Sequence, residues 1–565
     1  MFHAVARKGR QLAADPVLRR WLLARALGRT PAEPGFVAHR PAYLGPDWPG
    51  LPLEAPTRAL PALAAGEPEG PLVLRLPGIT PTVPPGGAEA AVAGTFADVE
   101  TQLALHRFAW VPLMDSGADP RWVGAMWSAW ARRHPAPDGS MAWHPYTAAE
   151  RAVNLLTFAA RHGLPEDAAA PLAAHAPAIA AGLEWFGDHH TSNHCANNGR
   201  GLYLLGLALG LERATEAGAR ILLAEGERIF RPSGVLREGS THYHLLLTRQ
   251  WASVWLAART HSRPETDAFG AVLAGAMAVL PHFDLPGRFP LMGDISPDCP
   301  PDHLSCLLPG RPMAAGWTGL LAVADRAALA ELRDRTPPAA SVEGWLRRDI
   351  AGWSGLWHGE PEGWSMMPGH GHQDCGAPEL HAGGEALFVD AGRGSYAQAG
   401  EADPYVGAGV HGGLSVDGAD PYPQNRPYYA AEFRAAQAGP AGLEAIPDGV
   451  RLVHHGYRRF GLGAVERVWR FREGAMRVDD TVEGRGRHRI TRRLVTGAAV
   501  AVDGGAAILT QPSGRRWRVA AEDARPALSP LTLWHAYGEG SPGTVLAFET
   551  EAVLPWRGTL TVEAL

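Results

Sequence analysis

Cysteine is scarce in this sequence, since 565 residues contain only Cys195, Cys299, Cys306 and Cys375. No two of them form a Cys-x-x-Cys pair, which excludes a zinc-ribbon site. Cys299 and Cys306 could bridge a loop in an oxidising compartment or stay reduced, because spacing alone does not fix connectivity.

Long apolar runs and an excess of positive charge are also absent. No run of 18 apolar residues occurs, so the sequence predicts no transmembrane helix. The net charge of −6 excludes a strongly basic nucleic-acid-binding surface over the whole chain, while a local basic cleft is compatible with it. The basic, amphipathic segment 1–29 has no uninterrupted apolar core of a secretory signal. It could touch an anionic membrane, but we expect an ordinary surface helix there.

The length and the hydrophobic periodicity predict several domains. A chain of 565 residues exceeds one ordinary core. Residues 1–95 are expected to form an N-terminal helix and a Pro-rich lead-in, and residues 96–335 a helical domain. Apolar residues recur there at i, i+3, i+4 and i+7, in segments 100–114, 121–134, 148–163, 198–210, 214–230, 244–260 and 268–283. Short connections between helices favour antiparallel packing, so we predict an incomplete α/α toroid.

The pattern changes after residues 335–340, which read RTPPAA and end the helical periodicity. Short β-rich segments follow, at 385–392, 414–418, 449–455, 464–471, 476–484, 488–495, 506–511, 515–522, 544–553 and 558–565. Residues 341–565 are therefore predicted to form an antiparallel β-sandwich. The expected fold class is α+β and multidomain, an α/α toroid followed by a β-sandwich, with a ligand cleft between the two domains.

The first motif with chemical potential reads TSNHCANNGRGLYLLG, at 191–206. Ser192 or Asn193 can cap the helix that follows. Capping does not explain His194, and a histidine at a helix entrance is a candidate base. The second motif, GVLREGSTHYHLLLTRQW at 234–251, has Ser240 as a helix cap and Tyr243 in the first turn. Taken alone, a tyrosine there is expected to be a core residue with its hydroxyl at the surface.

The third motif reads GHGHQDCGAPELHAGGEALFVDAG, at 369–392. His370 and His372 share one face if the segment is extended. Asp390 ends the next strand, and His411 opens a third. Two imidazoles and a carboxylate suit a zinc-type ion, while histidines that only cap hairpin loops are an equal alternative.

In their order and spacing these motifs resemble those of the heparinase II/III-like polysaccharide lyases, which are similar to alginate and oligoalginate lyases. The Asn-His helix start, the Gly-Ser-x-x-Tyr-His segment and the His-x-His-x-Asp stretch with its downstream Val-Asp-x-Gly carry the resemblance, which covers roughly residues 97–500. The resemblance implies an α/α toroid with a β-sandwich, and β-elimination at a uronic acid of a glycosaminoglycan or alginate.

The resemblance also implies roles for individual residues. Asn193 and His370 would neutralise the uronate carboxylate, and preorganised donors of this sort can contribute more to catalysis than any other single effect. His194 or the ionised Tyr243 would abstract the C5 proton, and Tyr243 would protonate the leaving O4. His372, Asp390 and His411 would hold a structural Zn²⁺ that fixes the loop of His370.

Partners and location follow from the same resemblance. The expected partner is an acidic polysaccharide or oligosaccharide, with no nucleic acid and no stable membrane insertion. The periplasm or cell envelope is the expected location, and the cytoplasm is the alternative because no clear signal peptide is visible. The oligomeric state is open, with a homodimer among the alternatives.

Two other functions are compatible with the scaffold. The segment before His411 contains no arginine where the family often has several, which motivates a non-catalytic role in saccharide binding or envelope polysaccharide assembly. A glycoside hydrolase is a third interpretation, because α/α toroids also host such enzymes. It ranks last, since it needs two facing carboxylates and the motifs offer His, Tyr and Asn.

Overall fold

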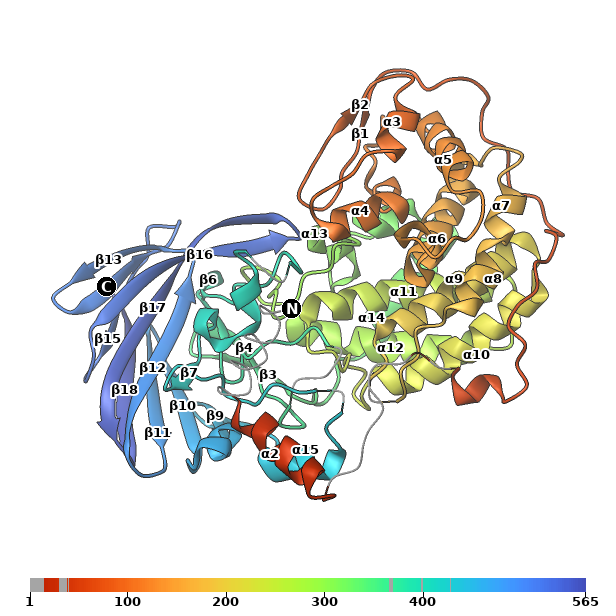
Figure 1. The fold of residues 1–565 in the computed structure, drawn as a ribbon. Helices are drawn as coiled ribbons and strands as arrows, with labels where there is room; N and C mark the ends of the chain where they lie inside the picture. Colours follow the sequence, from red (N-terminus) through yellow and green to blue (C-terminus); the bar gives the residue numbers. More distant parts are fainter. Residues whose placement is uncertain are drawn as a thin grey trace.

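The computed structural model describes residues 15–29, 38, 40–188, 190–364, 369–397, 400–426 and 428–565. Figure 1 shows a body of helices on one side and layers of long strands on the other, in chain order. This is the predicted fold class, an α/α toroid followed by an antiparallel β-sandwich. The predicted segment limits 1–95, 96–335 and 341–565 stay a prediction.

Long helices with short connections build the toroid. Their apolar faces pack against one another, as the 3.6-residue periodicity requires. The helices of the described chain up to residue 335 are α2 (Pro16–Ala26), α3 (Ala88–Val92), α4 (Val99–His106), α5 (Arg121–Arg133), α6 (Pro145–His162), α7 (Ala169–Ala173), α8 (His175–Ala181), α9 (Asn193–Leu209), α10 (Glu212–Ile229), α11 (Thr241–Thr260), α12 (Thr266–Phe283), α13 (Pro301–Leu304) and α14 (Val323–Arg335). Each of the seven segments with helical periodicity overlaps one of α4, α5, α6, α9, α10, α11 and α12.

Helix α12 is long and apolar enough, by length and composition, to cross a membrane. It is the one such helix in the part of the chain that the structure describes. A core helix of a globular domain passes the same test, so this is weak evidence for a span. In the toroid, Phe269, Leu273 and Leu280 of α12 are buried in the same apolar cluster as residues of α11.

Antiparallel strands follow the helices. One sheet has eight strands, in the order β13-β14-β15-β18-β11-β10-β9-β8, and two sheets have four strands each, in the orders β16-β17-β12-β7 and β3-β4-β5-β6. The short helix α15 (Ala431–Gln437) lies between β7 and β8 in the chain. The strands are β3 (Trp345–Ile350), β4 (Trp353–His358), β5 (Glu379–Ala382), β6 (Glu385–Phe388), β7 (Leu414–Val416), β8 (Gly442–Ile446), β9 (Gly449–His454), β10 (Val465–Arg472), β11 (Ala475–Val482), β12 (Arg487–Thr496), β13 (Ala499–Asp503), β14 (Ala506–Thr510), β15 (Arg516–Ala521), β16 (Pro526–Ala536), β17 (Glu539–Val553) and β18 (Trp556–Ala564).

One apolar core joins these three sheets. Trp357 of β4, Trp469 of β10 and Phe548 of β17 belong to the same buried cluster, although each comes from a different sheet. The eight-stranded sheet thus forms one layer of the sandwich, and the two smaller sheets contribute to the other.

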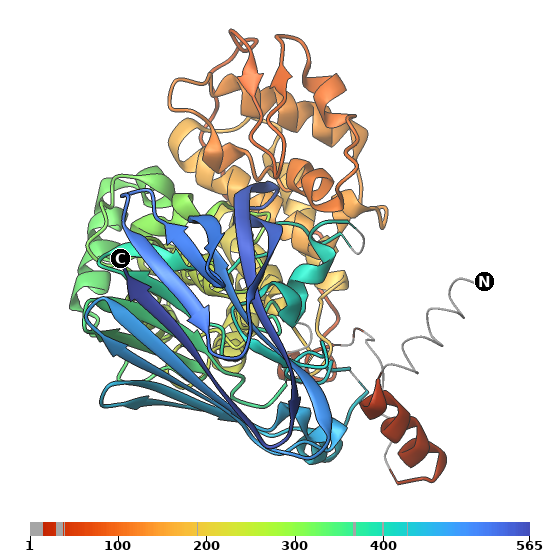
Figure 2. The ribbon, with the colours of Figure 1, turned by 90° about the vertical axis from the view of Figure 1, so that its left-hand side faces the viewer.

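The N-terminal segment contacts both domains. A small sheet of β1 (Leu72–Val73) and β2 (Thr82–Val83) buries Leu72 and Val83 in the cluster of the toroid. Helix α2 lies instead against the sandwich, beside α15 (Figure 1). Its Trp21 packs on Tyr428, with ring centroids 4.5 Å apart. Figure 2 shows α2 at the outer edge of the molecule, as a surface helix.

Candidate active site and metal site

Helix α9 begins at Asn193 and is capped by Ser192, whose side chain accepts a hydrogen bond from the His194 N–H at 3.4 Å. The Glu238 carboxylate fixes Asn193 on both sides. It accepts the Asn193 backbone N–H at 2.7 Å and the side-chain amide at 2.8 Å. The Asn193 Oδ1 is buried and has no hydrogen-bond partner among the described residues. One hydrogen of the amide nitrogen is therefore used by Glu238, and the other is left for a ligand.

Helix α11 begins one residue after Ser240, which is its cap as predicted. The Ser240 hydroxyl accepts the Tyr243 N–H at 3.2 Å and donates to the Asp294 carbonyl at 2.8 Å. Tyr243 is 5% exposed. Its hydroxyl was expected at the surface, but it lies 2.6 Å from the Tyr396 hydroxyl.

The loop of His370 connects the two domains. Its backbone N–H donates to the Glu238 carbonyl, and its carbonyl accepts the Asp294 N–H, each at 2.8 Å. The imidazole lies flat on the Tyr243 ring, with centroids 3.5 Å apart and an interplanar angle of 12°. The segment is irregular rather than a strand, so the extended geometry considered for His370 and His372 is not observed.

Tyr243 and Tyr396 form a short chain of hydroxyls. Tyr396 donates its hydroxyl hydrogen to the Ile295 carbonyl at 3.0 Å, so Tyr243 is the donor to Tyr396. Burial raises the pKa of Tyr243 well above its ordinary value, and the hydrogen bond with Tyr396 offsets this only in part. Tyr243 is therefore a neutral phenol at physiological pH, as a general acid must be.

His194 lies apart from this chain of hydrogen bonds. Its Nδ1 contacts the Glu184 carboxylate at 2.7 Å, and its ring lies against Tyr146 with centroids 4.4 Å apart. The side chain is 40% exposed. Burial lowers the pKa of His194, but the Glu184 carboxylate outweighs it and holds the pKa above its ordinary value. A histidine paired in this way is oriented for proton transfer, with the balance shifted towards imidazolium.

The three candidate metal ligands come together. Ligand atoms of His372, Asp390 and His411 all lie within 4.8 Å of one another, and all three residues are buried. His372 Nδ1 is buried with no hydrogen-bond partner among the described residues. His411 Nδ1 meets Asp390 Oδ2 at 2.7 Å. Two imidazole nitrogens and one carboxylate oxygen suit a metal ion with an open coordination position.

A buried ion pair holds the segment that carries Asp390. Arg288 of the toroid side donates to both oxygens of Glu379 on β5, at 2.7 and 3.0 Å, and to the Asp390 carbonyl at 3.1 Å. Glu379 also accepts the Asp390 N–H at 3.2 Å. Burial opposes ionisation of Glu379, but Arg288 and His381 lower its pKa to about 2. The segment that carries Asp390 is thus fixed from both domains.

The structure brings Asn193 and His370 together at Glu238, with Tyr243 stacked on His370, and it brings His372, Asp390 and His411 into a second group. Sequence reasoning missed three side chains that complete these groups, namely Asp294, Tyr396 and Glu184. Arg393 also contacts this group, with Nη1 3.3 Å from Asp294 Oδ1. All four cysteines are free thiols, including Cys299 and Cys306.

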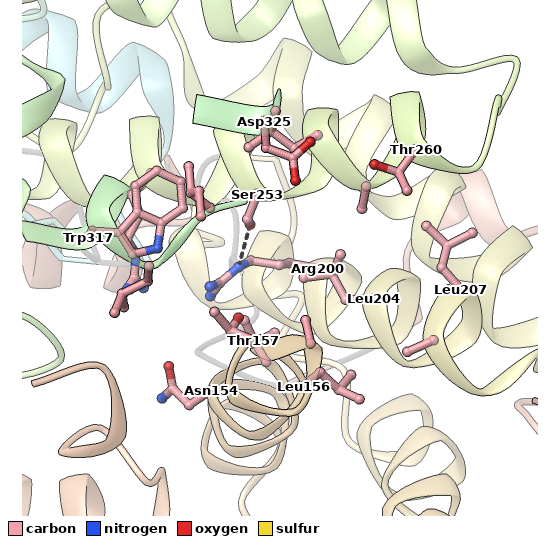
Figure 3. Close-up of a pocket in the computed structure, with 18 of the residues that line it drawn as sticks. Asn154, Leu156, Thr157, Arg200, Leu204, Leu207, Ser253, Thr260, Trp317 and Asp325 are labelled. Atoms are coloured by element: carbon pink, nitrogen blue, oxygen red, sulfur yellow. Dashed lines mark hydrogen bonds between the residues drawn. The ribbon is translucent and has the colours of Figure 1, made fainter. Parts of the chain in front are cut away.

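Two hollows lie near or within the toroid. A cavity of about 230 Å³ is lined by α6, α9 and α11, where Arg200 donates to the Ser253 hydroxyl at 3.1 Å (Figure 3). None of the seven predicted site residues lines it. A groove of about 850 Å³ is lined by Ser296 and by Tyr537 of the β16–β17 turn. Tyr537 accepts the Tyr396 N–H at 3.0 Å, but none of the seven predicted site residues lines this groove either.

Comparisons with known proteins agree with this architecture. Residues 358–552 match the family model of the heparinase II/III-like C-terminal domain. Among curated proteins, none matches this sequence. The resemblance to heparinase II/III-like lyases that the motifs indicated is confirmed for this part of the chain.

Solved structures extend the likeness to the toroid. Heparinase III is 14% identical to this chain, covers 84% of it and 78% of its own length, and superposes with a TM-score of 0.60. A mutant of the heparan sulfate lyase HepC from Pedobacter heparinus is 15% identical, with coverages of 83% and 78% and a TM-score of 0.51. At such identities the likeness shows the fold.

Proposed function

We propose that the protein is a polysaccharide lyase that cleaves a uronic-acid-containing polysaccharide or oligosaccharide by β-elimination. The observation that carries the proposal is the cluster of Asn193, Tyr243 and His370, built from three segments around Glu238. These side chains are the types that the reaction needs, and residues 358–552 match the heparinase II/III-like family model.

Asn193 and His370 neutralise the substrate carboxylate in this proposal. The C5 proton of a uronate is weakly acidic until the negative charge beside it is stabilised. Asn193 has one amide hydrogen left for a ligand. His370 donates Nδ1–H to Asp294 Oδ2 at 3.1 Å, so Nε2 is the nitrogen left for the substrate, and it must also carry a hydrogen to donate to the substrate carboxylate. Nε2 lies 3.7 Å from Glu238 Oε2, beyond hydrogen-bond distance.

Tyr243 supplies the proton to the leaving O4 oxygen, for which its neutral phenol is suited. The base is His194 or Tyr243, according to the configuration at C5. His194 serves as base in its neutral form, which Glu184 orients through Nδ1. Tyr243 would have to ionise first, and its raised pKa makes that step costly.

The groove lined by Ser296 and Tyr537 is the proposed path of the saccharide chain. Its other lining residues include the cationic side chain of Arg75 and the acidic side chains of Asp115 and Glu539. This mixture of charges favours one position of an acidic saccharide chain along the groove over others, because the carboxylates of the sugar must avoid the two acidic side chains.

We also propose that the ion of the second group is Zn²⁺, held by His372, Asp390 and His411. The ion would fix the loop of His370 and supply structural stability there. We further propose the periplasm or cell envelope as the location, where acidic polysaccharides are met, and fractionation of the source cells tests this. A homodimer is the oligomeric alternative to a monomer, and light scattering distinguishes them.

The direct test is an activity screen. Purified protein is incubated with heparan sulfate, alginate and hyaluronan, and the unsaturated product is followed by its ultraviolet absorbance. We expect product on at least one polymer, and none with Tyr243→Phe. Tyr203→Phe is the matched control, since Tyr203 is a buried tyrosine bonded to Glu265 and lies outside the cluster.

The screen also separates the alternative role. Binding of a polymer by the folded wild type without product, and binding unchanged in Tyr243→Phe, would favour a non-catalytic saccharide-binding or polysaccharide-assembly protein. Neither binding nor product on any uronate polymer contradicts both proposals.

A further inference from the structure

Asp294 stands between the two groups of site residues. Its carboxylate has two oxygens, and a different histidine takes each one. His370 Nδ1 donates to Oδ2 at 3.1 Å, and His372 Nε2 donates to Oδ1 at 2.9 Å. Asp294 is 6% exposed, so solvent contributes little to holding it. It belongs to neither predicted set of site residues.

The backbone of Asp294 is fixed as firmly as its side chain. Its N–H donates to the His370 carbonyl at 2.8 Å, and its carbonyl accepts the Ser240 hydroxyl at 2.8 Å. Gly293 precedes it at φ +82°, where a Cβ would lie 2.6 Å from the His370 carbonyl oxygen. Only glycine permits this approach of the two backbones. The backbone of Asp294 therefore cannot move without displacing the loop of His370.

The contact with His372 decides which of its nitrogens can bind a metal. Because Nε2 carries the hydrogen given to Asp294, Nδ1 carries the free lone pair. Nδ1 is the buried atom with no hydrogen-bond partner among the described residues. His411 is arranged in the same way, since its Nε2 lies 2.9 Å from the Tyr405 carbonyl and its Nδ1 faces Asp390. Both histidines thus turn Nδ1 inward and anchor Nε2 on an oxygen.

The contact with His370 decides which nitrogen meets the substrate. Nδ1–H is used by Asp294, so Nε2 is presented on the side of Glu238. The same bond also keeps the ring flat on Tyr243. A single carboxylate therefore sets the tautomer of a metal ligand and the orientation of a substrate-binding imidazole.

We propose that Asp294 is a positioning residue that couples the metal site to the active site. Occupation of the metal site by an ion fixes His372, His372 fixes Asp294, and Asp294 fixes His370. This inference rests on the proposed function and on the proposed ion. The contact of Asp294 with Arg393 is a separate interaction, and it offers a control.

The test uses Asp294→Asn in the full chain. An amide has one acceptor oxygen and a nitrogen that donates, so it cannot accept from both histidines. Zn²⁺ affinity is measured without substrate, by competition with a chromophoric chelator. We expect the affinity of Asp294→Asn to fall about 10- to 100-fold, the usual effect of losing such a partner. We also expect the visible spectrum of bound Co²⁺ to change.

Arg393→Met is the matched control, because it removes the ion pair with Asp294 and leaves both histidine contacts. Its Zn²⁺ affinity should stay within about threefold of wild type. If Asp294→Asn does not fold, as judged by circular dichroism, Asp294→Ser is measured instead, because serine is smaller and admits water. The same fall in Zn²⁺ affinity is expected for it.

Unchanged Zn²⁺ affinity and an unchanged Co²⁺ spectrum in a folded Asp294 variant would overturn the coupling, even if catalysis is lost. An affinity loss of the same size in Arg393→Met would also overturn it. Because the metal measurements need no substrate, they stand whether or not the protein proves to be a lyase.

Discussion

The imidazole of His370 lies flat on the phenol ring of Tyr243, with centroids 3.5 Å apart and planes inclined by 12°. His370 comes from the sandwich side of the chain, and Tyr243 comes from the first turn of α11. In the proposed β-elimination, this stack holds the nitrogen that binds the uronate carboxylate and the hydroxyl that donates the proton at a fixed separation.

Removal of the Tyr396 hydroxyl should lower the rate without abolishing it. Tyr396→Phe deletes the group that accepts the Tyr243 hydrogen and that can stabilise Tyr243 after it has given up a proton. Hydrogen bonds to charged groups contribute about 1.5–3 kcal/mol, so we expect kcat to fall about 10- to 100-fold on the polymer that the screen identifies. Tyr203→Phe serves again as control, and equal rates in wild type and Tyr396→Phe would contradict this role.

The Glu184–His194 pair should set one limb of the pH–rate profile. Glu184 holds the pKa of His194 above its ordinary value, so Glu184→Gln should lower that pKa. If His194 is the base, the rising limb of kcat/KM against pH moves to lower pH, because the neutral form appears earlier. If Tyr243 is the base and His194 acts as a cation, the falling limb moves to lower pH instead. A profile that does not move excludes His194 from either role.

Local features of the site could be predicted from the sequence, because they depend on neighbours in the chain. The caps at Ser192 and Ser240 and the helices α9 and α11 follow from residue type and periodicity. The Gly383–Gly384 pair joins the two strands β5 and β6, with both glycines at positive φ, as a Gly-Gly pair between two β-rich segments favours. Spacing alone left His372, Asp390 and His411 open between a metal site and loop caps, and the family resemblance placed them in one group, which the structure brings together.

Asp294, Tyr396 and Glu184 could not be predicted, because nothing local distinguishes them. Asp294 is 76 residues from His370 in the chain, and Tyr396 is 153 residues from Tyr243. Their partners are chosen by the way the sandwich packs on the toroid. The clearest sequence signal was Gly293 before Asp294. The need for glycine there can be recognised only once the backbone of His370 is known to lie against it.

A buried pair in the sandwich should make stability fall with pH. His358 lies 2.8 Å from Asp374 and stacks on Trp345. Burial lowers the pKa of His358, but Asp374 outweighs it and raises the pKa to about 9. The folded state therefore binds the proton more tightly than the unfolded state, whose pKa is about 6.5. The stabilisation is complete below about pH 6.5 and is lost as the pH rises through about 9.

Urea unfolding at pH 6, 7.5 and 9.5 measures this effect, in protein treated with chelator so that metal binding does not contribute. We expect His358→Gln to show a smaller fall in unfolding free energy over this range than wild type. His454→Gln is the matched control, because burial lowers the pKa of His454 to about 3 and leaves it neutral throughout. The same pH dependence in wild type and His358→Gln would show that this pair is not responsible.

Loss of the metal should weaken the fold at the domain junction. Binding of an ion to the folded state alone stabilises it by about 4 kcal/mol at a free concentration 1,000 times Kd. We therefore expect one zinc per chain by elemental analysis, and a lower Tm after chelation. His411→Ala should contain no zinc and show a Tm that chelator does not change. His454→Ala, a buried histidine of the sandwich outside the group, should keep its zinc. Zinc retained by His411→Ala, or no binding of added Zn²⁺ by the wild type, would contradict the proposed zinc site. Asp390 and His411 would then be a buried ion pair without a metal.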